Sequence, residues 1–256
     1  MSKLSDENKF LDFSDYGRSG GKLIANLFKN TKVTPIHVTW MFVLSALISI
    51  VCILQEKYIL AGFFILLKSI IDAADGELAR LKKTPSYTGR YLDSISDILI
   101  NFLLFITFAY VTYIPFSIAF FAFLCFQMQG TLYNFYYVIL RNKSINGDTT
   151  SRIFENTVPT ALPGESQKMV TFLYRLYRFL YGSFDWIIYK LDFSASKVRT
   201  IPKWFMSMVS IYGLGFQLLI MSVLLVLNLK EFIILFFSVY SLFILFFIGI
   251  RKLFIS

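Results

Sequence analysis

The chain has 256 residues, of which 56% are hydrophobic and 18% aromatic, and its formal net charge is +9. This composition is too apolar for an ordinary soluble domain and predicts a multi-span membrane protein. No basic–aromatic array or nucleic-acid-binding motif accompanies the positive charge, so we expect no nucleic-acid partner. Cys52 and Cys125 both lie in apolar runs and indicate neither a disulfide framework nor a zinc motif.

Residues 1–35 are predicted to form a cytoplasmic tail and a helix on the membrane surface. Residues 1–21 are polar and acidic, without the basic start and apolar core of a signal peptide, and indicate a loose tail. Apolar residues then recur at helical spacing, at Leu23, Ile24, Leu27 and Phe28. With lysines nearby, this pattern is typical of a short amphipathic helix on an anionic membrane surface. A plain juxtamembrane linker is the alternative.

Residues 36–256 are predicted to form one all-α integral membrane domain. A helix needs about 20 apolar residues to span the hydrocarbon core of a bilayer. Six segments meet this requirement, at roughly 36–54, 58–78, 91–114, 116–140, 204–228 and 231–250. The predicted fold is therefore six transmembrane helices preceded by one N-terminal interfacial helix.

The distribution of basic residues predicts the orientation of these helices. Of the 25 Lys and Arg residues, only Lys57 and Lys230 fall in the connections on one side, and Lys68 lies within the second predicted span. All the others fall on the opposite side. Because basic connections stay in the cytoplasm, we expect a multi-pass protein with both termini cytoplasmic. Anionic lipid headgroups are the expected partners of this basic face.

The long connection of residues 141–203 is predicted to be a cytoplasmic or interfacial insertion. Residues 147–152 and 160–165 are loop-like. Residues 167–193 mix apolar and aromatic side chains with several charges, and Gly182 interrupts them. This pattern favours a helical hairpin that caps the cytoplasmic face. An additional re-entrant pair is the alternative.

Four aspartates around the connection between the second and third predicted spans form two pairs, Asp72 with Asp75 and Asp93 with Asp97. Spacings of three and four residues place both members of a pair on one face of a helix. One pair is expected to end a helix and the other to begin the next, with a turn at residues 85–89. Carboxylates that face each other repel unless a cation holds them, and their oxygens suit Mg²⁺, Mn²⁺ or Ca²⁺. We therefore predict a site for one or two ions.

These aspartates are part of a longer pattern with fixed spacings. The pattern is Asp72, two residues, Asp75-Gly76, two residues, Ala79-Arg80, eight residues, Gly89, three residues, Asp93, three residues and Asp97. It resembles the signature of the CDP-alcohol phosphatidyltransferases, with every defining position present. The signature itself covers about a tenth of the chain, and the predicted helix layout extends the likeness to most of it.

The resemblance implies that a substituted phosphate moves from a CDP-linked donor to an alcohol acceptor and that CMP leaves. CDP-diacylglycerol is the expected donor. Mg²⁺ or Mn²⁺, as two ions, would bridge its pyrophosphate. Asp72, Asp75 and Asp93 are the expected ligands, and Asp97 is the expected general base, also touching metal.

The resemblance also suggests binding residues and an assembly. Gly76, Ala79 and Gly89 would line the CDP pocket, where side chains must be small, and Arg80 would position the cluster or the phosphate. Because family members often dimerise through membrane helices, a homodimer is expected from the resemblance alone.

The acceptor site is predicted from weaker signals. Gln127, Asn134 and Arg141 fall near one face of the fourth predicted span. A polar stripe in a membrane helix is expected to face protein or a wet cavity, although some of it can bond between helices. Lys68, four residues before Asp72, either neutralises the aspartates or reaches an anionic group of a substrate. The identity of the alcohol does not follow from these residues.

Two other activities stay open. In the choline/ethanolamine branch of the family, the CDP-linked donor carries the headgroup and diacylglycerol is the acceptor. Carboxylates in a multi-span protein can instead form the ion or proton pathway of a transporter. Such pathways usually lie near mid-membrane on broken helices, whereas the sequence predicts these aspartates at one end of two helices.

Overall fold

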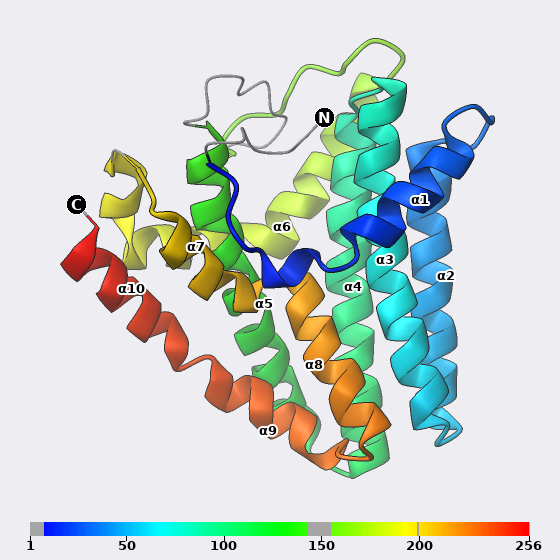
Figure 1. Cartoon of the computed structure of the whole chain (residues 1–256), viewed down its shortest axis with the longest axis vertical. Helices are drawn as coiled ribbons and strands as arrows, with labels where there is room; N and C mark the ends of the chain where they lie inside the picture. Colours follow the sequence, from blue (N-terminus) through cyan, green and yellow to red (C-terminus); the bar gives the residue numbers. More distant parts are fainter. Residues whose placement is uncertain (1–7, 143–154, 199, 256) are drawn as a thin grey trace.

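The computed structural model describes residues 8–142, 155–198 and 200–255. Every regular element within these ranges is a helix, as Figure 1 shows. The prediction of an all-α fold is therefore confirmed for the described residues.

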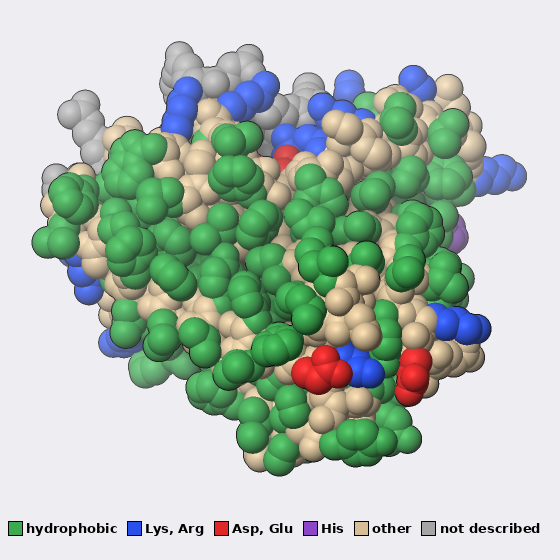
Figure 2. All heavy atoms as spheres, turned by 60° about the horizontal axis from the view of Figure 1, so that its bottom comes forward, with side chains coloured by type: hydrophobic (Ala, Val, Ile, Leu, Met, Phe, Trp, Pro, Cys, Tyr) green, Lys and Arg blue, Asp and Glu red, His purple; other side chains and the backbone are tan. Residues whose placement is uncertain are grey.

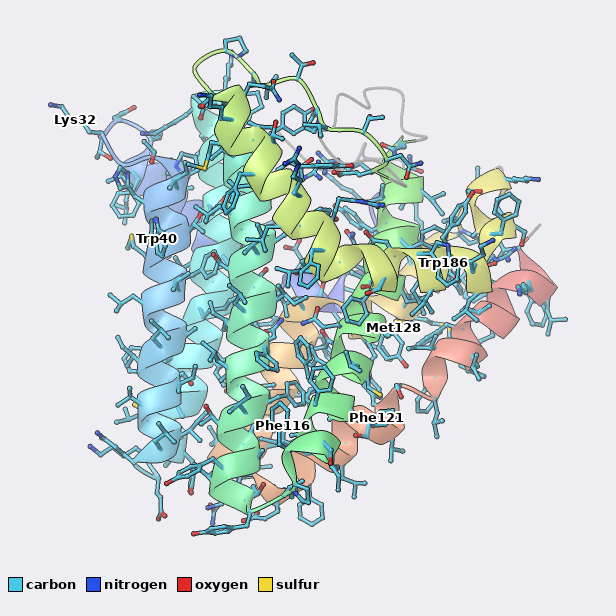
Figure 3. The ribbon with its side chains drawn as sticks, turned by 180° about the vertical axis from the view of Figure 1, so that it is seen from behind. Lys32, Trp40, Phe116, Phe121, Met128 and Trp186 are labelled. Atoms are coloured by element: carbon cyan, nitrogen blue, oxygen red, sulfur yellow. The ribbon has the colours of Figure 1, made fainter. Side chains whose placement is uncertain are left out.

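Four long helices stand next to one another and form the part of the molecule that carries the aspartates (Figures 1 and 3). They are α2 (Pro35–Leu54), α3 (Tyr58–Lys82), α4 (Tyr87–Thr112) and α5 (Phe116–Asn142). Short connections make consecutive helices antiparallel. Lys83 and Tyr113 end α3 and α4 in the left-handed conformation that commonly terminates a helix.

The remaining long elements cover α4 and α5 or pack beside α3. They are α6 (Gln167–Leu191), α7 (Lys203–Val209), α8 (Leu214–Val226), α9 (Glu231–Tyr240) and α10 (Phe243–Phe254). Figure 3 shows α6 running obliquely across α4 and α5, both of which it contacts. α8 packs against α3, and α9 against α5.

Four candidate membrane spans, rather than six, meet criteria of length and apolar composition among the described residues. They are α2, α4, α5 and the continuous stretch α9–α10, and a fifth arises if the pair α7–α8, bent by 47°, is one span. α3 has 25 residues, but Lys68, Asp72 and Asp75 interrupt its apolar run. The structure therefore confirms four or five of the six predicted spans by length and composition. The predicted span that does not meet these criteria is α3.

The N-terminal segment is packed, so the prediction of a loose tail is wrong for the part that is described. A short helical turn, η2 (Phe13–Asp15), precedes α1 (Arg18–Phe28), which lies against α3 (Figure 1). A Cβ at Gly21 would come within 2.9 Å of the backbone of Ala73 and Ala74, so this glycine allows α1 to approach α3 closely. Leu23 and Leu27, which are exposed on the other face of α1, give the helix the predicted amphipathic character.

The segment predicted as a helical hairpin is instead one continuous helix, α6, followed by the short helical turn η3 (Phe193–Lys197). Gly182 lies inside α6 and does not break it. A glycine in a helix costs about 1 kcal/mol relative to alanine, which tertiary packing readily offsets. Here Val170 and Tyr174 of α6 are buried together with Tyr91 of α4. The loop predicted at residues 147–152 lies outside the described residues.

A buried ion pair fixes the end of α10. Arg251 of α10 pairs with Asp192, which follows α6, and the Tyr136 hydroxyl of α5 donates to the same carboxylate at 2.7 Å. Both charged side chains are buried, so each depends on the other for compensation.

The outer surface agrees with a membrane environment. Hydrophobic side chains cover most of the face in Figure 2, while Lys and Arg gather along its upper edge. The connections at residues 55–57, 113–115 and 227–230 lie at one end of the molecule, and the α3–α4 connection lies at the other (Figure 1). The connections that carry Lys57 and Lys230 thus lie at the end of the molecule opposite to the basic α3–α4 connection.

Candidate metal and nucleotide site

The aspartates lie inside α3 and α4 rather than at the facing ends of these helices. α3 continues for ten residues beyond Asp72, and α4 begins ten residues before Asp97. At 1.5 Å per residue, Asp72 and Asp97 are about 15 Å along their helices from the α3–α4 connection, and Asp75 and Asp93 are about 10 Å from it. The prediction that the pairs end one helix and begin the next is wrong, because both helices extend past the apolar segments from which their ends were predicted.

Three of the four carboxylates converge. Ligand oxygens of Asp72, Asp93 and Asp97 all lie within 4.8 Å of one another. Asp93 Oδ1 is buried and has no hydrogen-bond partner among the described residues. Because a buried oxygen of this kind normally has a partner, the arrangement fits a bound cation, and an all-carboxylate set suits Mg²⁺ or Mn²⁺.

Asp75 lies one helical turn from Asp72 but is not part of this group of three. Its Oδ2 accepts a hydrogen bond of 2.5 Å from the Thr39 hydroxyl of α2. Thr39 therefore connects α2 to the aspartate-bearing face of α3. Nothing in the local sequence pattern identifies this residue, because the contact joins positions 36 residues apart. A ligand role for Asp75 stays a prediction.

Lys68 supplies the positive charge that the carboxylates meet inside the protein. Its side chain is only 1% exposed, and its ammonium donates to Asp72 Oδ2 at 3.0 Å and to Asp97 Oδ1. The ammonium also lies 4.8 Å from the centre of the Phe42 ring. Of the two roles predicted for Lys68, the geometry favours neutralisation of the cluster.

The residues predicted to line a CDP pocket occupy different surroundings. A Cβ at Gly76 would meet only the Arg80 guanidinium, at 3.5 Å, so the space over this glycine is open. Arg80 pairs with Glu77 at 2.9 Å, and its buried Nε has no partner among the described residues. Ala79 is one turn beyond Gly76 on α3. The N–H of Gly89 donates to the Ser86 hydroxyl at 2.8 Å in the first turn of α4.

The first turn of α4 is also capped by Glu165, which the sequence pattern did not identify. The carboxylate accepts hydrogen bonds from the Ser86 hydroxyl at 2.8 Å and from the backbone N–H of Thr88 at 2.7 Å. A carboxylate is favourable there because the N-terminus of a helix carries unpaired N–H groups and partial positive charge. Glu165 therefore fixes the start of the helix that carries Asp93 and Asp97.

The predicted acceptor residues are spread along α5. Gln127 is buried, and its Nε2 has no hydrogen-bond partner among the described residues, whereas Asn134 is exposed. Arg141 is half-buried and lies within electrostatic range of Arg80 and Arg90. The structure thus brings Arg141 near Arg80 at one end of the stripe and leaves Gln127 more than three turns deeper.

Tyr181 is a further residue near the site that sequence analysis missed. Its hydroxyl donates to the Ser94 carbonyl at 2.8 Å, which holds α6 against the turn of α4 between Asp93 and Asp97. An aromatic residue in an amphipathic segment gives no local signal of such a contact.

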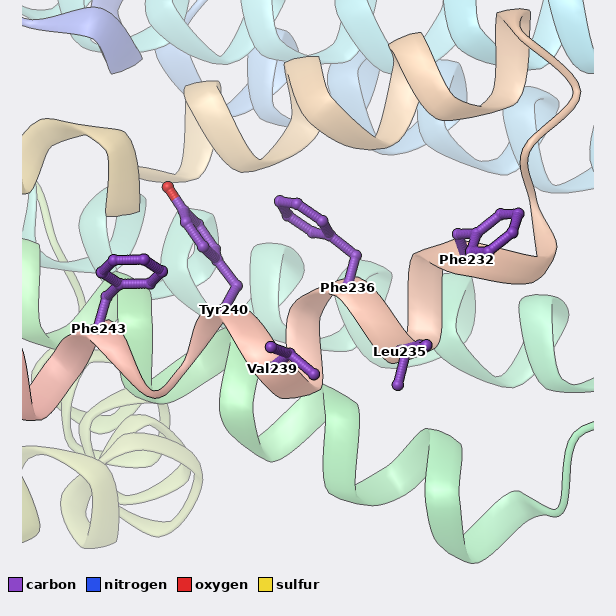
Figure 4. Close-up of a pocket in the computed structure, with 6 residues that line it drawn as sticks. All are labelled: Phe232, Leu235, Phe236, Val239, Tyr240 and Phe243. Atoms are coloured by element: carbon purple, nitrogen blue, oxygen red, sulfur yellow. The ribbon is translucent and has the colours of Figure 1, made fainter.

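An apolar groove lies elsewhere, on α9 and α10 (Figure 4). It has a volume of about 350 Å³ and is lined by Phe232, Leu235, Phe236, Val239, Tyr240 and Phe243. None of these side chains is ionisable at neutral pH, so the groove offers no group for phosphate or metal chemistry.

Metal binding can be measured without an activity assay. We expect MgCl₂ or MnCl₂ to raise the unfolding temperature of the detergent-purified protein, because a ligand that binds only the folded state stabilises it, by about 2.7 kcal/mol at 100 times Kd. Asp93→Asn should abolish this rise. Asp185→Asn, which alters a carboxylate of α6 outside the group, is the matched control. An equal rise in wild type and Asp93→Asn would exclude Asp93 as a ligand.

The Glu165 cap predicts a pH dependence of stability. Partial burial raises the pKa of Glu165, but hydrogen bonds from the Thr88 N–H and the Ser86 hydroxyl lower it more, so the pKa lies below its ordinary value. The contribution of Glu165 to stability is therefore fully present above the ordinary value of about 4.3 and is lost as the pH falls through the lowered pKa. Glu165→Gln should reduce the free energy of unfolding by about 1 kcal/mol at pH 7.

Thermal unfolding of both proteins between pH 3 and pH 7 measures this effect. The difference between wild type and Glu165→Gln should shrink below about pH 4. A difference that stays constant across this range would show that the charge of Glu165 does not stabilise the cap.

Comparison of the sequence with known protein families identifies a family whose matched region includes the aspartates. The sequence model of the CDP-alcohol phosphatidyltransferase family matches residues 32–181. No curated protein and no solved structure gives a significant match. The matched region is more than half of the chain and contains all four aspartates, the open glycine and the capped start of α4. The chain belongs to the CDP-alcohol phosphatidyltransferase family, and it is an enzyme of that metal-dependent family.

Proposed function

We propose that this enzyme synthesises a membrane phospholipid by transferring a substituted phosphate from CDP-diacylglycerol to an alcohol, with release of CMP. The family gives the class of reaction. The observation that carries the proposal is the convergence of Asp72, Asp93 and Asp97 beside the open space over Gly76. Carboxylates that can hold a divalent cation thus lie next to a surface on which a nucleotide can rest.

Asp72 and Asp93, with Asp75, would hold the metal, and the bound ions would neutralise charge that develops on the departing CMP. Gly76 and Ala79 leave room for the CDP moiety, and Arg80 meets its phosphates. All of these side chains belong to α3 or α4. A small change in the distance between the two helices should therefore affect donor binding.

Asp97 is the proposed general base, which accepts the proton of the acceptor hydroxyl at a carboxylate oxygen. It lies one turn further from the α3–α4 connection than Asp93. Lys68, in contact with Asp97, orients the carboxylate. The acceptor hydroxyl would therefore approach from the deeper side of the cluster.

Positive charge near the cytoplasmic end supports an anionic, CDP-linked donor. Arg141 lies within electrostatic range of Arg80 and Arg90, and no carboxylate of the described residues pairs with it. An anion would relieve the repulsion among these guanidinium groups. Both CDP-diacylglycerol and a CDP-linked headgroup satisfy this requirement, so the choline/ethanolamine-type reaction is the second outcome that an assay must distinguish.

The chemical proposal is tested with purified protein, radiolabelled CDP-diacylglycerol and a panel of alcohols. Wild type should release CMP and form a labelled lipid in the presence of Mg²⁺ or Mn²⁺, and excess chelator should stop the reaction. Asp97→Asn should keep donor binding but lose about 10²–10⁴-fold in turnover, the usual contribution of a general base.

Three outcomes would change this assignment. Loss of donor binding in proportion to activity would make Asp97 a metal ligand rather than the base. Transfer only from CDP-choline or CDP-ethanolamine to diacylglycerol would select the other branch of the family. Metal-dependent ion flux in proteoliposomes without CMP release would favour a transporter.

For the arrangement in the membrane, we propose six spans, with α3 as the one that composition alone does not identify. α1, α2 and α8 pack against α3, so its charged side chains can face protein instead of lipid. Because basic connections stay in the cytoplasm, we propose that both termini and the aspartates lie on the cytoplasmic side. A homodimer is proposed from the family resemblance.

Cysteine labelling of intact cells tests this arrangement, because the native Cys52 and Cys125 are buried. An impermeant thiol reagent should modify Lys57→Cys from outside. Thr84→Cys, in the exposed connection between α3 and α4, should react only after the membrane is permeabilised. Labelling of both positions from the same side would contradict a membrane-spanning α3.

A further inference from the structure

Among the described residues, three buried amide side chains lack complete hydrogen bonding: Asn101 of α4, Gln127 of α5 and Gln217 of α8. The first two lie deeper in the helix bundle than the aspartates. Asn101 of α4 is 2% exposed and Gln127 of α5 is 6% exposed. Asn101 Oδ1 and Gln127 Nε2 have no partner among the described residues. Lipid cannot supply one, and an unpaired buried polar group costs about 1–3 kcal/mol. These two atoms therefore require a partner that is not part of the described chain.

The two amides lie at the same depth. The rings of Phe105 on α4 and Phe123 on α5 are in contact, with their centres 6.3 Å apart. Asn101 precedes Phe105 by four residues, and Gln127 follows Phe123 by four residues. Because α4 and α5 are antiparallel, both amides lie one turn closer to the aspartates, on the faces that carry the ring pair. Asp97 lies one further turn above Asn101.

Aromatic side chains close the space below the amides. Phe105 also contacts Phe126 with a centroid distance of 5.4 Å, and Phe126 contacts Phe237 of α9 at 5.0 Å. Beside these rings, Gln217 and Gln129 donate to the carbonyls of Phe126 and Phe237. The rings themselves give the polar column of Asp97 and Asn101 an apolar base.

Above the amides, α5 carries no side chain at Gly130, one turn beyond Gln127. A Cβ built there would be in ordinary contact with Gln217 Oε1 at 3.6 Å and with the Tyr212 carbonyl oxygen at 4.0 Å. Asn134, one further turn up, is exposed, and the Asp97 side chain is 13% exposed. Solvent therefore reaches the aspartate side of the two amides.

The two amides also define the chemistry of their partner. Each carries an acceptor oxygen and a donor NH₂ group, and no hydrogen bond of the described residues fixes which way either amide points. A hydroxyl group both donates and accepts, so it can satisfy the two amides in either orientation. A carboxylate or phosphate oxygen only accepts, and an ammonium group only donates.

We propose that Asn101 and Gln127 form the floor of the acceptor site and bind a hydroxyl of the alcohol other than the one that attacks phosphorus. This inference rests on the proposed function and extends it to the class of acceptor. An alcohol whose one hydroxyl is held by Asp97 needs a second hydroxyl to reach the floor. The acceptor is therefore a water-soluble polyol or polyol phosphate, not diacylglycerol, which has a single free hydroxyl.

Thiol labelling tests whether the floor is wet, without any need for a substrate. A small hydrophilic methanethiosulfonate reagent should modify Gln127→Cys. Gln129→Cys is the matched control, because Gln129 is equally buried on α5 but donates to the Phe237 carbonyl and accepts from Gln217 Nε2. Equal reaction rates at the two positions would overturn the inference.

Kinetics then test the hydroxyl contact. Gln127→Met and Asn101→Leu keep side-chain size but remove the hydrogen bond, and Gln129→Met is the control. With glycerol 3-phosphate, inositol 1-phosphate and inositol as probe alcohols, we expect the KM of the alcohol used to rise about 3- to 10-fold in each floor variant. The KM for CDP-diacylglycerol should not change. The penalty should vanish with an acceptor analogue that lacks the second hydroxyl, propane-1,3-diol 1-phosphate in the case of glycerol 3-phosphate.

The outcomes separate this inference from the proposed function. If wild type releases no CMP with any alcohol, the proposed function fails and the acceptor floor fails with it. If wild type is active but the floor variants keep the acceptor KM of wild type, only the floor assignment is wrong. Preferential transfer to diacylglycerol by wild type would also overturn it.

Discussion

The contact of Lys68 with Asp72 and Asp97 is the interaction on which the site depends. It joins α3 to α4 through a lysine that is only 1% exposed and carboxylates that are 25% and 13% exposed. Removing one partner of a buried ion pair leaves an uncompensated charge, which is far more costly than the net value of the pair. The spacing between the two helices is therefore set where the chemistry takes place.

One lysine does not balance four aspartates. The negative charge that remains is suited to divalent cations, and the unpartnered Asp93 oxygen is available to bind one. Lys68 and a metal ion would thus both neutralise charge of the same cluster. Because Lys68 already contacts Asp72 and Asp97, these carboxylates stay close together without a metal ion, although like charges at this distance repel.

Other parts of the chain hold the two helices from outside. α1 packs on α3 through Gly21, Glu165 caps the start of α4, and Tyr181 attaches α6 to α4 near Asp93 and Asp97. These contacts come from segments far apart in sequence. α3 extends to Lys82 and α4 begins at Tyr87, both beyond the apolar runs of the sequence. These polar ends of the two helices are held by contacts of this kind.

The sequence predicted the aspartate group and the helices that carry it because both leave local patterns. Spacings of three and four residues and apolar runs are visible without the fold. The contact of Thr39 with Asp75 and the Glu165 cap could not be predicted, since each joins distant positions that have no pattern of their own. The ends of α3 and α4 were misplaced for a related reason: hydropathy marks where apolar residues stop, while hydrogen bonding continues the helix into polar sequence.

The charges of α3 also constrain how the protein is made. A charged residue at the centre of an inserting helix costs about 2.5–3.5 kcal/mol, and α3 carries Lys68, Asp72 and Asp75 within eight residues. Such a segment enters a bilayer poorly by itself. α2 and α4, which are apolar enough to insert, flank it on both sides in the chain. If α3 spans the membrane as proposed, it should enter the bilayer only together with its neighbours in the chain, α2 and α4.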